Sequence, residues 1–423
     1  MLPPETPEAP ETTLTVTNRQ GTPVTRYDLP FGFFSESLIV RSNTKWTARV
    51  SDQAAEWLSV SVGSAVTAEV SVAVNTTGEV RTGTLLFETQ DGKATVEIPV
   101  TQQSGQTIGA SPIQDLMLIY DNDSGEPYTR ERFRATVATD EENPRWLFDG
   151  FLFLTSRFDG KTLAGEPTIA SSNKEDWLKL LDFYFGHDSH SVPALDAAIG
   201  ALKPRVQGPF HRRKVVIMLP DPQDRQTDWG ELDGKKLDFS NFEDRIAACK
   251  WYVDQLLDHF ARREYANIQL AGIYWIKESG SFLPKYLSQV ADYIHAKGLD
   301  FYWIPYYEAF GFSKWASYGF DRAYYQPNYM THPEFTRTRL YEACDMAKAC
   351  GMLMELEFET HQSLQVNADY VDVYEELGLF ETQSLAYYEA SALEYWKEGI
   401  AEERAFYERI CKLVAARQQA FYQ

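Results

Sequence analysis

Residues 351–359 read GMLMELEFE, and the fold prediction starts from this stretch. Two kinds of side chain alternate along it, with Met352, Met354, Leu356 and Phe358 on one face and Leu353, Glu355, Glu357 and Glu359 on the other. Such alternation predicts a β-strand with one wholly apolar face. In a parallel barrel that apolar face packs against helices, which turns the glutamates toward the barrel axis. A carboxylate there calls for a functional reason, because burying a charge is costly.

The rest of the chain supplies seven more short apolar runs. Together the eight candidate strands are residues 114–121, 147–155, 214–220, 268–276, 300–307, 321–326, 351–359 and 384–389. Loops or helical patterns separate them, including a long insertion over 156–213, and one long final helix is expected over 394–421. Eight strand–helix alternations match a (β/α)8 or TIM barrel of the α/β class, which we expect over residues 113–423.

The N-terminal part has a different texture. Residues 1–12 are rich in proline and glutamate, the composition of a stiff, solvated tether. Residues 13–105 contain seven short stretches of apolar–polar alternation, separated by turn signals such as Asp91-Gly92. This pattern predicts a small all-β, immunoglobulin-like sandwich ahead of the barrel.

Several residues of this segment form a recognisable set, namely Trp46, Trp57-Leu58, Asn75, Arg81-Thr82-Gly83 and Ile98-Pro99-Val100-Thr101-Gln102. Through them the segment resembles the BACON domain, a small sandwich that precedes catalytic domains in Bacteroidetes surface enzymes. The resemblance implies binding of carbohydrate or mucin. Trp46 and Trp57 are either sugar platforms or core residues, and a tryptophan in a strand usually packs in the core. A spacer role for the domain also stays open.

Charge and composition argue against several classes of function. The net charge of −21 repels nucleic-acid phosphates and anionic lipids, so no nucleic-acid partner is expected. No transmembrane helix is expected, because no apolar run reaches about 18 residues. The four cysteines lack zinc-ligand spacing, and the pair His187 and His190 does not favour a metal site. No cofactor is expected either, since P-loop, GxGxxG and GxSxG motifs are absent from the sequence.

The Pro/Glu tether suits a chain that is held off a surface. We therefore expect an exported protein, either periplasmic or an outer-membrane lipoprotein at the cell surface, whose signal has been removed. We expect it to be a monomer.

The carboxyl ends of the predicted strands carry carboxylates, amides and aromatic residues, and this is where (β/α)8 barrels place their chemistry. The chain has 10 Trp, 24 Tyr and 25 Phe residues, and all but seven of them follow residue 110. Aromatic faces pack on the C–H faces of sugars, so we expect a carbohydrate ligand. Glycoside hydrolysis needs two carboxylates across a sugar, one to protonate the leaving oxygen and one to attack the anomeric carbon or activate water.

The predicted catalytic pair is Glu278, after the fourth strand, and Glu357, on the seventh. Glu355 and Glu308 are alternative catalytic residues. The predicted substrate-binding residues are Asp121, Asp221, Trp275, Tyr306, Gln326, Asn328 and Tyr387. Burial and like charges at the inner mouth are expected to raise the pKa of at least one glutamate, as a general acid at neutral pH requires.

Six phrases of the barrel segment also form a recognisable set: LIYDND (118–123), FDGFLFL (148–154), IMLPDP (217–222), GIYWIKES (272–279), WIPYYEA (303–309) and YYQPNY (324–329). Through them the chain resembles DUF4855, a barrel family of unknown function, over most of residues 113–360. More loosely it resembles retaining glycoside hydrolase barrels with glutamates on strands four and seven, which implies Glu278 and Glu357. Lys277 stands where those hydrolases have an Asn that binds the sugar 2-OH, so retaining and inverting chemistry both stay open.

The leading interpretation is a glycoside hydrolase or another glycan-processing barrel that acts on polysaccharide or glycoprotein glycans. One alternative is a non-catalytic carbohydrate-binding surface protein of a glycan-utilisation system. A structural surface component is the third.

Overall fold

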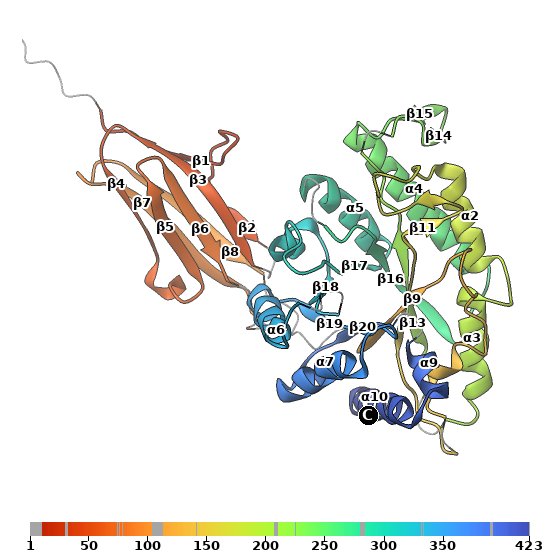
Figure 1. Cartoon of the computed structure of the whole chain (residues 1–423). Helices are drawn as coiled ribbons and strands as arrows, with labels where there is room; N and C mark the ends of the chain where they lie inside the picture. Colours follow the sequence, from red (N-terminus) through yellow and green to blue (C-terminus); the bar gives the residue numbers. More distant parts are fainter. Residues whose placement is uncertain are drawn as a thin grey trace, which may run out of the picture. The chain divides into compact units, whose positions relative to one another are not determined.

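The structure is a computed structural model of the whole chain. It describes residues 11–29, 33–73, 75, 77, 79–103, 113–140, 142–206, 210–224, 226–279, 284–330, 332, 334–389 and 392–422. The chain forms two compact units, one built from the N-terminal strands and one from the barrel (Figure 1). Most of the predicted tether, residues 1–10, lies outside the described residues.

The larger unit is a closed barrel of eight parallel strands (Figure 1). In chain order they are β9 (Asp115–Tyr120), β10 (Gly150–Leu154), β13 (Arg213–Leu219), β16 (Ile268–Trp275), β17 (Asp300–Trp303), β18 (Arg322–Tyr325), β19 (Leu353–Glu357) and β20 (Leu385–Tyr388). Each strand pairs with the next, and β20 pairs with β9 to close the ring. The strands coincide with the eight predicted runs, so the prediction of an eight-stranded parallel barrel is confirmed.

The two faces of β19 meet different surroundings. Phe358, directly after β19, packs against Trp396 and Phe406 of the outer helices, with ring centroids 5.6 and 6.0 Å away. Glu355 and Glu357 lie on the other face, opposite Ala386 and Tyr388 of β20. Both glutamates are buried. The apolar face therefore meets the helices and the glutamates point toward the axis, as the alternation predicts.

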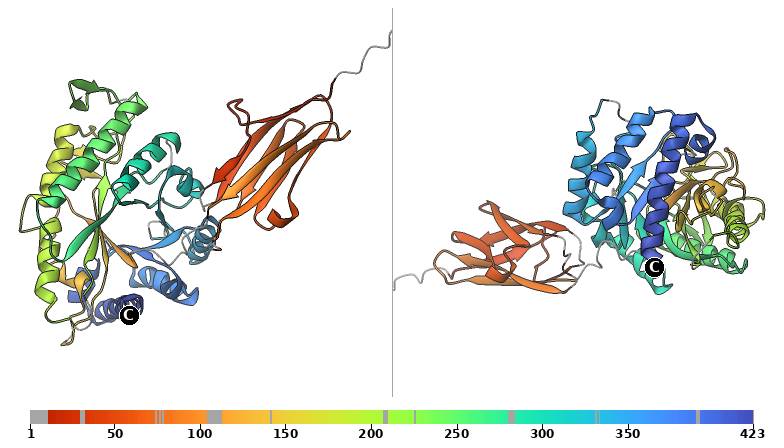
Figure 2. Two further views of the ribbon diagram at one scale, coloured as in Figure 1. Left: turned by 180° about the vertical axis from the view of Figure 1, so that it is seen from behind. Right: turned by 90° about the horizontal axis from the view of Figure 1, so that it is seen from below.

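Helices cover the outside of the barrel (Figure 2). They are α1 (Arg134–Val137), α2 (Lys174–Phe185), α3 (Ser191–Leu202), α4 (Phe242–Ala261), α5 (Pro284–Ala296), α6 (Thr338–Cys350), α7 (Leu364–Glu376), α8 (Leu379–Thr382), α9 (Ala392–Glu398) and α10 (Ala401–Tyr422), with a 3-10 helix η2 (Phe312–Tyr318) after β17. In the described part of the chain, every helix is too short or too polar to span a membrane.

The prediction of one long final helix is wrong, because α9 and α10 are separated at Gly399 and Ile400. Glycine destabilises a helix interior by about 1 kcal/mol relative to alanine. The new helix start is stabilised by Glu403, whose Oε2 accepts a hydrogen bond of 2.8 Å from the Ile400 N–H.

The insertion between β10 and β13 contains a hairpin, β11 (Arg157–Phe158) and β12 (Lys161–Thr162), followed by α2 and α3. The Asp221 N–H donates to the Leu163 carbonyl at 2.8 Å, and the Gln223 side-chain amide donates to the Thr162 carbonyl at 3.0 Å. The insertion therefore packs against the loop after β13, at the carboxyl ends of the strands. A second hairpin, β14 (Gly230–Leu232) and β15 (Lys235–Leu237), lies between β13 and α4.

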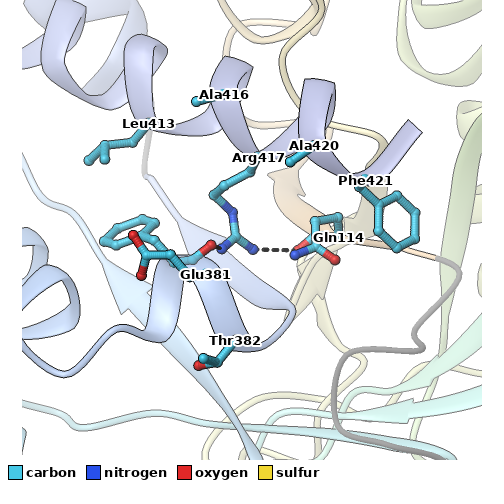
Figure 3. Close-up of a pocket in the computed structure, with 9 residues that line it drawn as sticks. Gln114, Glu381, Thr382, Leu413, Ala416, Arg417, Ala420 and Phe421 are labelled. Carbon is cyan, nitrogen blue, oxygen red and sulfur yellow. Dashed lines mark hydrogen bonds between the residues drawn. The ribbon is translucent and has the colours of Figure 1, made fainter. Parts of the chain in front are cut away.

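The last helix is fixed to the opposite end of the barrel, where the strands begin. The Arg417 Nε donates to Asp115 Oδ1 at 2.7 Å, and the Gln418 amide donates to Asp115 Oδ2 at 2.8 Å. The Tyr422 hydroxyl donates to Asp149 at 2.8 Å. A pocket of about 450 Å³ adjoins this network and is lined by Gln114, Phe380, Glu381, Thr382, Leu413, Ala416, Arg417, Ala420 and Phe421 (Figure 3).

The N-terminal unit consists of two four-stranded sheets. Their orders are β1-β3-β6-β5 and β2-β8-β7-β4, with bounds β1 (Leu14–Thr17), β2 (Tyr27–Leu29), β3 (Phe34–Ser42), β4 (Trp46–Val50), β5 (Leu58–Ser64), β6 (Thr67–Val72), β7 (Arg81–Thr89) and β8 (Thr95–Gln102), and a 3-10 turn η1 (Asp52–Ala54). Buried residues of both sheets form one hydrophobic cluster, against which Trp46 and Trp57 pack. This packing favours a core role for the two tryptophans. The immunoglobulin-like and BACON assignments stay predictions.

Candidate functional site

Three glutamates meet at the inner mouth of the barrel, and we call them the carboxyl cluster. Glu355 and Glu357 project inward from β19, and Glu278 comes from the segment that follows β16. The charge of Glu278 acts on both of the other two carboxyls, so the three groups lie within electrostatic range of one another. The structure thus brings together the predicted pair Glu278 and Glu357 and the alternative Glu355.

Burial is the main influence on these carboxyls. It raises the pKa of Glu278, and it raises the pKa of Glu357 to about 7. The pKa of Glu355 lies well above the ordinary value, because burial acts first and the charges of Glu357 and Glu278 add to it. At neutral pH the cluster therefore holds protons that three solvent-exposed glutamates would have lost.

Glu357 is the best supported of the three by hydrogen bonds. Its Oε2 atom accepts a hydrogen bond of 2.8 Å from the Asn328 N–H and one of 2.7 Å from the Tyr370 hydroxyl of α7. Both bonds favour the charged carboxylate and lower the pKa that burial raises. Because the two donors share one oxygen, Oε1 receives neither of these bonds.

Glu355 has no comparable support. Its side chain is fully buried, and neither of its oxygens has a hydrogen-bond partner of normal geometry among the described residues. The Gln326 amide still lowers the pKa of both Glu278 and Glu355, so it lies close enough to act on their charges even without an ideal bond to Glu355. Since desolvation dominates, the surroundings of Glu355 favour its neutral, protonated form.

The segment after β18 connects all parts of the cluster. Gln326 lowers the pKa values of Glu278 and Glu355, and the Asn328 N–H donates a hydrogen bond to Glu357. Asn328 has a positive φ of 51°, a conformation that asparagine tolerates better than most residues. The predicted residues Gln326 and Asn328 are therefore at the site, Asn328 through its backbone. Tyr306 is half-buried and pairs with Gln326 through the backbone.

Three tyrosines surround the carboxyls, and none of them is among the predicted substrate-binding residues. The pKa values of Tyr120 and Tyr274 are raised well above the ordinary value by burial and by the charges of the cluster. Tyr388 packs edge-to-face on Tyr120 with 5.3 Å between ring centroids, and burial raises its pKa to about 12. All three are neutral at physiological pH; Tyr120 and Tyr388 are half-buried beside the glutamates, and Tyr274 is buried.

Two predicted aspartates are buried next to the site and bonded to other protein groups. Asp121 accepts a hydrogen bond from the Ser191 hydroxyl at the start of α3, and burial raises its pKa to about 6. Asp221 forms an ion pair of 3.3 Å with Lys277, although burial raises its pKa. Lys277 is therefore engaged by Asp221 at the position where the hydrolase resemblance expects an amide.

Two predicted aromatic residues face away from the mouth. Trp275 is fully buried and packs on Tyr286 of α5, and the Tyr387 hydroxyl bonds Asp115 at the first residue of β9. Each lies next in sequence to an inward-facing tyrosine, Tyr274 or Tyr388, and alternate strand residues point to opposite faces. Trp275 and Tyr387 are core residues in this structure, which corrects the prediction that they contact substrate.

Glu308 is also separate from the carboxyl cluster. Its side chain is exposed, its φ is 58°, and its N–H bonds the Tyr325 hydroxyl at 2.7 Å. The charge of Glu308 is not one of the main causes of the pKa shifts of the three cluster carboxyls. The structure gives Glu308 no position from which it pairs with Glu278 or Glu357.

Two more residues of the site have no local sequence signal. Tyr370 lies on a helix, 13 positions after Glu357, and reaches the carboxylate only because α7 folds back on β19. Arg339, near the start of α6, lowers the pKa of Glu357 by its charge. Tyr274, by contrast, is predictable from the alternation of side chains along a strand. It lies an even number of positions before Glu278, so it points to the same face.

Among the described residues, no three or more His, Cys, Asp or Glu side chains are arranged closely enough to hold a metal ion together. The rings of His187 and His190 stack with centroids 5.0 Å apart, and burial together with the neighbouring His187 lowers the pKa of His190.

Comparison with known proteins gives several solved structures of low identity. A Bacteroides ovatus GH5 xyloglucanase matches at 10% identity over 95% of this chain and 100% of its own, with a TM-score of 0.32. A putative alpha-galactosidase from Bacteroides fragilis matches at 9% over 96% and 79%, with a TM-score of 0.36. A family 123 glycoside hydrolase from Clostridium perfringens matches at 8% over 89% and 78%, with a TM-score of 0.29.

No curated protein matches the chain. The model of the domain of unknown function DUF4855 matches residues 115–412, which is most of the chain and nearly all of the barrel. On this match, the protein belongs to the DUF4855 family.

Proposed function

We propose that this protein is a glycoside hydrolase in which Glu278 and Glu357 are the two catalytic carboxyls. The observation that carries the proposal is the carboxyl cluster itself, in which buried Glu355 and Glu357 and half-buried Glu278 lie at one barrel mouth within electrostatic range. Two groups with separately tuned pKa values are what acid–base cleavage of a glycosidic bond requires.

The surroundings of each carboxyl favour a division of roles. Glu357 accepts two hydrogen bonds on Oε2, which stabilise its carboxylate and leave Oε1 for the substrate. It is the nucleophile, or the base that activates water. Burial raises the pKa of Glu278 by more than the Gln326 amide lowers it, and this net rise suits the acid that protonates the leaving oxygen.

Glu355 takes a third role in this proposal. It is fully buried, and desolvation together with the charges of Glu357 and Glu278 raises its pKa, which favours the neutral form beside the other two carboxyls. The half-buried Tyr120 and Tyr388 offer neutral hydroxyls and ring surface to a sugar.

Cleavage is tested with the full chain on a panel of plant, microbial and mucin glycans. We expect Glu278→Gln and Glu357→Gln each to reduce sugar release by at least about 100-fold, the usual contribution of a positioned acid or base. Glu308→Gln is the matched control, since it makes the same chemical change on an exposed glutamate outside the cluster. Circular dichroism and thermal unfolding establish that each variant is folded.

If either cluster variant keeps wild-type activity, that residue loses its proposed role. The second candidate function is a non-catalytic glycan-binding barrel, favoured by the tyrosines around the cluster. It predicts glycan binding by calorimetry with no sugar release from the wild-type protein. Absence of both binding and release leaves the structural surface component.

We also propose that the N-terminal unit is a BACON-like spacer and that the protein is an exported monomer. Packing of Trp46 and Trp57 against the core supports the spacer role over a glycan platform. A signal peptide in the full-length gene product, together with the mass in solution by light scattering, tests the export and monomer proposals.

A further inference from the structure

Arg339 differs from other cations near the mouth, and the inference drawn from it rests on the proposed glycan function. Lys277 pairs with Asp221, Arg245 with Asp224, and Arg157 with Glu166. Arg339 forms no ion pair with a carboxylate within the described part of the chain. Its Nε donates to the Pro327 carbonyl at 2.9 Å, which leaves both terminal nitrogens of the guanidinium without a carboxylate partner.

The Arg339 guanidinium is held in a fixed plane. Its central carbon lies 3.2 Å from the ring centroid of Tyr307 and 4.4 Å from that of Phe335. Tyr307 in turn packs near Tyr325 of β18, with 5.7 Å between ring centroids. An arginine stacked in this way has already lost much of its freedom, so little more is lost when it binds a ligand.

Its position places this cation at the edge of the carboxyl cluster. The carbonyl that accepts its hydrogen bond belongs to Pro327. The residue before it, Gln326, lowers the pKa values of Glu278 and Glu355. The residue after it, Asn328, donates its N–H to Glu357. The charge of Arg339 also acts on Glu357. A sugar bound between the carboxyls would therefore carry its substituents toward this guanidinium.

We propose that Arg339 binds an anionic substituent, a carboxylate or a sulfate, of the glycan held at the carboxyl cluster, which makes acidic glycans the substrate class. The planar guanidinium fork matches the geometry of both groups and binds them with two parallel hydrogen bonds. The chain carries a net charge of −21, so its long-range field repels acidic polymers. Salt screens that field beyond about 8 Å at physiological ionic strength, whereas a direct contact with Arg339 persists.

The test uses acidic polysaccharides in three forms: native, carboxyl-reduced and desulfated. Binding is measured by calorimetry with the full-length Glu278→Gln protein, so that no ligand is consumed. We expect the native form to bind about 10- to 100-fold more tightly than the form that lacks the recognised group, the range of a charge-assisted bidentate contact. Loss of affinity on carboxyl reduction identifies a uronate, and loss on desulfation identifies a sulfate ester.

Arg339→Gln in the same background is expected to remove this preference. Arg337→Gln is the matched control, because Arg337 lies two positions away and faces the carboxylates of Asp369, Asp372 and Glu376. It should keep the preference. Thermal unfolding verifies the fold of both variants. Arg339→Lys keeps the positive charge but lacks the planar fork, so it should recover only part of the preference for the native acidic glycan.

Equal binding of all three forms, or an unchanged preference in Arg339→Gln, overturns the inference and leaves the glycan function standing. The inference is also overturned, with the glycan function intact, if neutral glycans are bound and cleaved as well as acidic ones. Failure of every form and every neutral glycan to bind overturns the proposed function, and the inference with it.

Discussion

The hydroxyl of Tyr370 offers a sharp test of how Glu357 is tuned. It donates a hydrogen bond of 2.7 Å to Glu357 Oε2, and this bond favours the carboxylate. Tyr370→Phe removes that donor and keeps the ring. The pKa of Glu357, about 7 in the wild-type protein, must then rise.

The size of the rise follows from the strength of the bond. A hydrogen bond to a charged group contributes about 1.5–3 kcal/mol, and about 1.4 kcal/mol corresponds to one pKa unit, so the pKa rises by about 1 to 2. If Glu357 acts as the carboxylate, the acid limb of the pH profile moves to higher pH by the same amount. At pH 6 the variant should be about 10- to 100-fold slower than the wild type, and the two should converge above pH 9.

The assay is the pH dependence of kcat/KM, which reports ionisations of the free enzyme. Tyr374→Phe is the matched control, since its hydroxyl lies one turn further along α7 and donates to the backbone carbonyl of Glu355 at 2.7 Å. Tyr370→Phe also leaves the Met330 N–H, which bonds this hydroxyl at 3.1 Å, without a partner. Both variants should therefore lose about 1–3 kcal/mol of stability, and only Tyr370→Phe should shift the profile.

Three outcomes would refute this reasoning. An unmoved acid limb in Tyr370→Phe means that Glu357 is not the group whose ionisation limits activity. An alkaline limb that moves to higher pH, in place of the acid limb, means that Glu357 works in its protonated form. An equal shift in both variants means that general loosening of α7, rather than the lost donor, causes the change.

Three further predictions concern stability, each measured by urea unfolding of the full chain. Arg417→Met leaves Asp115 buried without its cation and should cost about 3–5 kcal/mol, against less than about 1 kcal/mol for Arg409→Met in a more exposed pair. Gly272→Ala puts a methyl group 2.6 Å from a backbone carbonyl of β17 and should cost about 1–3 kcal/mol. The raised pKa of Glu355 stabilises the fold below the unfolded pKa of about 4.5, and this stabilisation is lost as pH rises through the folded pKa. Relative to Glu355→Gln, the wild type should lose up to about 1.4 kcal/mol per pH unit above pH 5.

The barrel was predictable because its signal is local. Each strand is a short apolar run bounded by polar residues, and the alternation in β19 fixes which face meets the helices. The break between α9 and α10 was not anticipated, although Gly399 marks it. A single glycine costs a helix only about 1 kcal/mol, so the pattern on either side of it read as continuous.

Only those site residues that lie at strand ends or on the inward face of a strand could be predicted from the sequence. Glu278 and Glu357 follow from strand position, and Tyr274 could have been found by counting back from Glu278. The choice of Trp275 and Tyr387 was wrong by one residue, which in a strand is the difference between the axis and the outer helices. Tyr370 and Arg339 act from helices, and no local pattern says which helical residue reaches back to a strand.

The anchoring of α10 also has a consequence for how the chain is made. Asp115 and its partner Arg417 are 302 positions apart. At about 5–20 residues per second, a ribosome delivers the arginine roughly 15–60 s after the aspartate. For most of that interval β9 has neither its counter-ion nor β20 beside it, so the ring cannot close. We expect nascent chains to depend on chaperones until the closing helix emerges.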